Sequence, residues 1–192
     1  MTVASSVTSG MQAALMLARG RADGVHLLAD DMTEARRSFW AALICLPAFV
    51  CLRLLGWRSG ALPVQAHAFA LDLLSYAIGW VGFALLSWRI ANAMGVAARW
   101  PRCIAMWNWC NVVQYLLLVV FSIPGLLGAP APLDEAAQLF ALCWALWLEW
   151  FAFRLTLGIG VVPAVGLVGL DLAIGVVLTG VTQSLVASGS VG

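Results

Sequence analysis

The chain has 192 residues, of which 63% are hydrophobic and 10% are charged, and its mean hydropathy is +0.97. Soluble globular domains carry about 25% charged residues, so the composition excludes that class and indicates an integral membrane protein. Ten basic and nine acidic residues leave a net charge of +1, with no strongly basic stretch. We therefore expect no nucleic-acid partner.

Residues 1–37 are predicted to form a short amphipathic arm on the cytoplasmic side. Apolar residues recur there at helical spacing, which predicts one or two short helices broken near Gly20 and Gly24. Asp31, followed three residues later by Glu34, resembles a capping box that starts the helix leading into the membrane. The arm either lies on a surface or a partner, or is a lead-in packed under the bundle, and we favour the lead-in.

Five apolar runs follow, each long enough to cross about 30 Å of hydrocarbon, which takes roughly 20 helical residues. The predicted fold class is therefore all-α, an integral membrane bundle of five transmembrane helices over residues 38–186. Trp40 and Trp57 bracket the first run as interfacial anchors, Arg53 is expected to snorkel outward, and Asp72 to reach for water. The spans are expected at about 39–55, 68–88, 103–126, 136–153 and 162–186, with 187–192 as an outer-side tail.

The distribution of arginine predicts the orientation, because basic loops usually stay in the cytoplasm. One predicted side carries only Arg53 and Arg58. We predict a bacterial inner (cytoplasmic) membrane protein with a cytoplasmic N-terminus and a periplasmic C-terminus. The cytoplasmic side then carries Arg19, Arg21, Arg36, Arg37, Arg89, Arg99, Arg102 and Arg154.

The cysteines and histidines do not predict a metal site or a cofactor. His26 and His67 are expected on opposite sides of the membrane, so they cannot bind the same metal ion or haem. The cysteines form no CxxC pair and lie in or beside apolar runs, where cysteine is usually a small hydrophobe. They are Cys45, Cys51, Cys103, Cys110 and Cys143.

Polar side chains are expected to gather at one depth of the bundle. A charge at the bilayer centre costs about 2.5 to 3.5 kcal/mol, so intramembrane acids need a reason to be there. Helical rise brings Asn108, Asn111, Glu149, Arg154 and Asp171 to overlapping depths in the inner leaflet. If they converge, the acids would be neutralised by Arg154 or kept protonated, with the amides completing their hydrogen bonds.

This candidate site has three interpretations. It is a polar clamp that fixes helix register, a proton or ion pathway, or a site for a lipid headgroup or a partner. We favour the clamp, because the sequence shows neither an internal repeat nor a second polar layer. No GxSxG, HExxH or phosphate-binding glycine loop is found, so we expect no enzyme activity and no catalytic residue.

Four sequence runs resemble a group of small proteobacterial five-span membrane proteins that are loosely Yip1-like. The resemblance covers most of the chain, from about Leu15 to Leu185. It implies a five-helix bundle with a cytoplasmic N-terminus that acts through protein or lipid contacts. The runs are RSFWAALICLPAF (37–49), WNWCNVVQ (107–114), LEWFAFRLTLGI (148–159) and GLDLAIGVVLTG (169–180).

We therefore expect a non-catalytic membrane protein that serves as scaffold, accessory subunit or assembly partner of a larger inner-membrane complex. Its partners would be membrane lipids and other membrane subunits, or a second copy of the chain. The alternative is a small transporter or channel that uses Glu149 and Asp171. Hydration separates the two functions, because a transporter needs a water-reachable cavity at these acids, whereas a clamp should be dry and paired.

Overall fold

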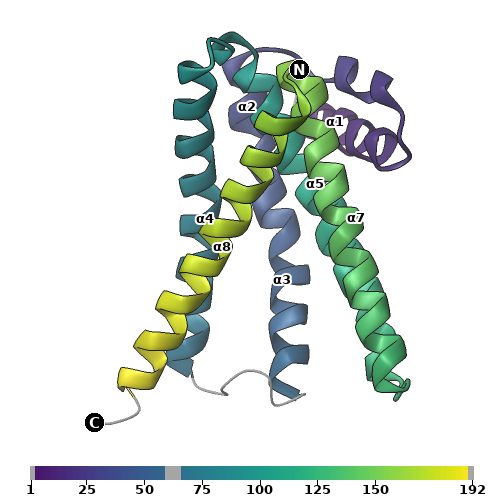
Figure 1. The fold of residues 1–192 in the computed structure, drawn as a ribbon, viewed down its shortest axis with the longest axis vertical. Coiled ribbons are helices and arrows are strands. Elements are labelled where there is room, and N and C mark those ends of the chain that lie inside the picture. Colours follow the sequence, from purple (N-terminus) through teal and green to yellow (C-terminus); the bar gives the residue numbers. More distant parts are fainter. Residues whose placement is uncertain (1–2, 59–65, 190–192) are drawn as a thin grey trace.

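The computed structural model describes residues 3–58 and 66–189, and within these ranges every regular element is a helix (Figure 1). Five stretches of helix are long and apolar enough to cross a membrane. The predicted fold class is confirmed, and the chain is an all-α membrane protein. The long helices are α3 (Trp40–Arg58), α4 (Ala66–Ala93), α5 (Trp100–Phe121), α7 (Ala131–Leu157) and α8 (Val161–Gly189).

Most of these helices extend past the span expected from hydropathy. α7 includes Asp134 in its first turn and Arg154 in its last turn, and both charges match the helix dipole. Such charges end an apolar run without ending a helix. The third expected span is instead divided, because α5 ends before Ser122 and the short helix α6 (Ile123–Leu126) follows.

Some expectations fall at the limits of the described residues. Helix α8 continues to Gly189, so the first part of the expected tail at 187–192 is helical. Residues 190–192 lie outside the described part, as do the side chains of Trp57 and Arg58, expected as an interfacial anchor and an outer-side charge.

The N-terminal segment packs against the bundle. It consists of α1 (Val3–Ala18), the 3-10 helix η1 (Ala22–Leu27) and α2 (Met32–Ser38). Ala13, Ala14 and Leu17 of α1 are fully buried, and α1 and α2 both contact α5. The segment is therefore a lead-in that shares the core of the membrane domain.

The start of α2 follows the capping pattern in part. The Oδ1 atom of Asp31 accepts the backbone N–H of Glu34 at 2.8 Å, as expected of an N-cap. The Glu34 side chain does not return to the cap, because its Oε1 atom accepts the hydroxyl of Ser6 at 2.6 Å. The Glu34 side chain, which would complete the capping box, thus joins α2 to α1 instead.

Helix α5 is the centre of the molecule, with contacts to α1, α2, α3 and α7. Trp109 is fully buried, and a Cβ at Gly10 of α1 would overlap its ring. On another face of α5, Trp107 stacks on Phe83 of α4 at 4.3 Å between ring centroids, and Phe83 stacks on Phe153 of α7 at 5.7 Å. These rings join three of the long helices.

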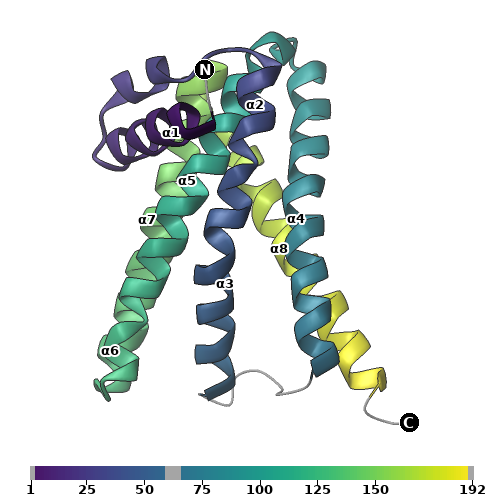
Figure 2. The ribbon, with the colours of Figure 1, turned by 180° about the vertical axis from the view of Figure 1, so that it is seen from behind.

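The bundle is closed at one end and open at the other. The helices gather at the end that carries α1 and α2, and toward the other end they separate into α4 with α8 on one side, α3 in the middle and α5 with α7 on the other side (Figures 1 and 2). We call the first the arginine-rich end, because Arg99 binds the Leu157 carbonyl there and Arg102 pairs with Asp30. At the opposite end, α3 finishes and α4 begins.

The contact between α1 and α5 can be tested at Gly10. Gly10→Ala is expected to lower the free energy of unfolding by about 1 to 3 kcal/mol, the usual cost of overpacking. Gly82→Ala is the matched control, because a Cβ there has no neighbour within 4 Å. Thermal unfolding of the detergent-purified variants measures both. Equal stability of the two variants would show that α1 does not lie on Trp109.

Candidate functional site

The structure divides the five polar residues that the sequence places at one depth. Asn108 is fully buried and faces α2, where its Nδ2 atom donates to the Ser38 hydroxyl at 2.7 Å. Its Oδ1 atom is buried and has no hydrogen-bond partner among the described residues. Asn108 therefore belongs to the contact between α5 and the N-terminal segment and not to the acids.

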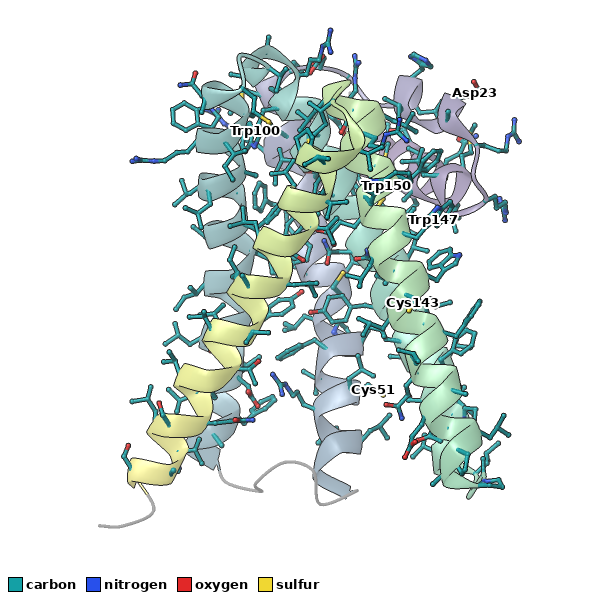
Figure 3. The ribbon with its side chains drawn as sticks, in the orientation of Figure 1. Asp23, Cys51, Trp100, Cys143, Trp147 and Trp150 are labelled. Carbon is teal, nitrogen blue, oxygen red and sulfur yellow. The ribbon has the colours of Figure 1, made fainter. Side chains whose placement is uncertain are left out.

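Arg154 forms no ion pair with either intramembrane acid. Its guanidinium lies 4.9 Å from the ring centroid of Trp150, and its Nε atom is buried without a partner. Trp150 and Trp147 both project from α7 (Figure 3). Residues 149 and 154 are about 140° apart around a helix, so they face different neighbours. The expectation that Arg154 neutralises the acids is wrong.

Glu149 and Asp171 do meet, and we call them the carboxyl pair. Glu149 is only 4% exposed, and its Oε1 atom accepts the indole N–H of Trp107 at 3.2 Å. The two carboxyl groups lie close enough to interact with each other. Two carboxylates this close repel each other when both are ionised, which favours a proton on one of the two. Of the two expected ways to neutralise the acids, only the proton is compatible with the position of Arg154.

A cavity of about 190 Å³ lies between α3, α4, α5 and α8 and reaches Asp171. We call it the polar cavity. Asn111 lines it beside Asp171, although its amide donates to the backbone of Trp107 at 3.0 Å and not to an acid. The other polar lining residues are Arg53, Asp72, Ser75, Tyr76, Trp80, Trp107, Tyr115, Thr179 and Thr182.

The end of the polar cavity nearer the opposite end of the bundle carries a second polar layer. Arg53 pairs with Asp72 at 3.2 Å, and the hydroxyls of Ser75 and Thr182 are 2.7 Å apart. Arg53 and Asp72 thus bind each other, whereas each was expected to reach for water alone. The expectation of no second polar layer is also wrong. These four residues come from three helices, so no single apolar run contains enough of them to show the layer in its sequence.

The sequence does contain a signal for this lining. Residues three, four, seven or eight positions apart lie on one face of a helix. A search for polar residues at these spacings in each span would have found the three contributing faces. They are Asp72, Ser75 and Tyr76 on α4; Trp107, Asn111 and Tyr115 on α5; and Asp171, Thr179 and Thr182 on α8.

The chemistry available at this site is hydrogen bonding and proton binding. In the described ranges, no three His, Cys, Asp or Glu side chains gather as metal ligands would. All five cysteines are free thiols, and Cys103 and Cys110 are buried in α5. Carboxyl, amide, hydroxyl and indole groups remain.

No family model, curated protein or solved structure matches this chain.

The ion pair of the second polar layer can be tested by a double-mutant cycle. Arg53→Leu and Asp72→Leu are each expected to lower the free energy of unfolding by about 2 kcal/mol or more, because each leaves a largely buried charge alone. The double variant should lose less than the sum of the two. Thermal unfolding in nanodiscs gives the coupling energy, and additive losses would show that the pair does not form in the bilayer.

Proposed function

We propose that the chain is a small transporter or channel, the second of the two functions that the sequence suggests. The observation that carries this proposal is the polar cavity, which reaches an intramembrane acid. Ionisable residues inside a membrane domain are costly, and those that face a cavity mark ion or solute pathways. A dry polar clamp would leave no such space beside Asp171.

The shape of the cavity supports access from one side. Arg53, in the second polar layer, keeps about a quarter of its side chain exposed. At the other end of the cavity, Trp80 and Trp107 are 6% and 4% exposed, with ring centroids 5.1 Å apart. Together with Phe83 and Phe153 they form what we call the aromatic wall. A pathway through the bundle would require these rings to separate.

We also propose the membrane and the orientation. The protein would lie in a bacterial inner membrane, with the arginine-rich end in the cytoplasm and the C-terminus in the periplasm. The eight arginines assigned to one side support this orientation. The polar cavity would then open toward the periplasm. Membership of the Yip1-like group is part of this proposal and rests on the four sequence runs.

A flux assay tests the transport function. The purified protein is placed in liposomes that contain a pH-sensitive dye, and a membrane potential drives protons or radioactive sodium inward. We expect flux of one of these cations, reduced at least about tenfold in Asp171→Asn, because this acid lies on the pathway. Glu135→Gln is the control, because this exposed acid of α7 lies outside the polar cavity. If well-folded protein moves neither cation, this function is wrong.

A second candidate function is that of scaffold, accessory subunit or assembly partner. The opposite end of the bundle supports it, since a groove of about 900 Å³ separates α3 from α5, α6 and α7. Its walls are mainly apolar and include Leu52, Leu118 and Leu139. On α8, Gly166 and Gly169 have no neighbour within 4 Å of a Cβ, which leaves room for a second helix. Lipids, other subunits or a second copy could fill these spaces.

Purification in native nanodiscs tests the assembly function. Mass spectrometry should then find another membrane protein, or a second copy, in whole-number ratio to the chain. Gly169→Leu should weaken a complex that uses this face of α8, because the larger side chain keeps helices apart. Val181→Leu, an exposed position about 120° away around the same helix, is the control. A chain that is always recovered alone would contradict the assembly function.

A further inference from the structure

We propose that the carboxyl pair, Glu149 and Asp171, is a proton-binding site that exchanges its proton with water in the polar cavity. The cation carried is then the proton. This inference rests on the proposed transport function, and it names the ion.

The charge balance around the pair favours a proton. With both acids ionised, two negative charges would lie within hydrogen-bonding reach in a largely buried site. Arg53, which lines the same cavity, pairs with Asp72, and Arg154, on the same helix as Glu149, lies on Trp150. One indole donor, from Trp107, is too little to balance two charges. A shared proton removes one charge and supplies the missing donor.

The two acids have different access to water. Asp171 is half-buried and lines the polar cavity, whereas Glu149 is almost fully buried and does not line it. A proton would therefore pass from a hydronium ion in the cavity to the carboxylate of Asp171, leaving water. It would then be shared between Asp171 and the neighbouring carboxyl group of Glu149. Asp171 is the exchange group, and Glu149 holds the proton inside.

The other titratable groups around the cavity do not supply this proton. On α3 and α4, Arg53 and Asp72 neutralise each other. Thiol and phenol groups are neutral near pH 7, and burial disfavours their charged forms. This applies to Cys45 of α3, to Tyr76 of α4, and to Cys103, Cys110 and Tyr115 of α5. The carboxyl pair is left as the proton-exchanging group.

Sodium fits this position less well. A hard cation needs several free oxygen ligands around it. The hydroxyls of Ser75 and Thr182 bind each other in the second polar layer, and Thr182 lies about three helical turns from Asp171 along α8. Asn111 donates its amide N–H to its own helix, so its Oδ1 atom is the one amide oxygen of the lining that could join the pair. Few oxygen atoms other than those of the pair remain available at Asp171.

Dicyclohexylcarbodiimide provides the test, because it reacts with protonated carboxyl groups in apolar surroundings. The acid proton moves to a carbodiimide nitrogen, the carboxyl oxygen bonds to the central carbon, and rearrangement gives an N-acylurea with no leaving group. In nanodiscs, mass spectrometry should locate the adduct on Asp171, because this acid shares the proton and lines the polar cavity, whereas Glu149 does not line it. Labelling should fall at least about tenfold as pH rises from 5 to 9, because the reactive form is protonated. It should disappear in Asp171→Asn and persist in Asp134→Asn.

A second measurement uses the unmodified chain, in case Asp171→Asn misfolds. An infrared difference spectrum between acidic and alkaline samples should contain the band of a protonated carboxyl group, and Asp171→Glu should retain a shifted band. Labelling that sodium blocks at constant pH would overturn the proposal in favour of a sodium site. Labelling that is absent, or independent of pH, would also overturn it.

The two proposals can fail separately. Cation flux without labelling of the pair would leave the transport function standing and refute the proton site. Labelling of Asp171 with the expected dependence on pH, without flux, would support the proton site and refute the transport function.

Discussion

Polar side chains within the spanning helices must find partners inside the protein, because hydrocarbon offers none. This constraint explains the interior of the bundle. Arg53 pairs with Asp72, and Ser75 is hydrogen-bonded to Thr182. Glu149 accepts the indole N–H of Trp107 and lies close to Asp171. The first two pairs lie between different helices at the open end, and the third joins α7 and α8 nearer the arginine-rich end. The polar cavity lies where α4 and α8 separate from α3 and α5, between the second polar layer and the aromatic wall.

Helix α5 decides which polar residues meet. Its buried first half directs neighbouring residues to different partners, with Asn108 on Ser38 of α2, Trp107 on Glu149, and Trp109 against Gly10. Successive residues on a helix are about 100° apart, so this separation is unavoidable. The N-terminal segment thus occupies one face of α5 and leaves another face free for the acids. Burial of α1 and α2 fixes the rotation of the helix that shapes the cavity.

Sequence reasoning succeeded for features that depend only on position along the chain. Hydropathy located all five long helices, and the Asp31 pattern located the start of α2. Depth along each helix follows from a constant rise, so Glu149 and Asp171 could be placed together. Rotation about each helix axis does not follow from depth, because neighbouring helices set it by packing. Arg154 and Asn108 therefore lie at the expected depth but on other faces, and the second polar layer, shared among three helices, was missed.

On the proposed function, the aromatic wall is the element that would have to move. The closed side of the polar cavity consists of stacked or edge-packed rings from α4, α5 and α7. The carboxyl pair contacts this wall, because Glu149 accepts the indole N–H of Trp107. Loss of the proton would leave two negative charges beside the indole N–H that Trp107 donates to Glu149. Repulsion between the two carboxylates would alter this hydrogen bond, which positions Trp107. Protonation and the closure of the wall are then linked through one side chain. A carboxyl pair placed elsewhere in the bundle would lack this link.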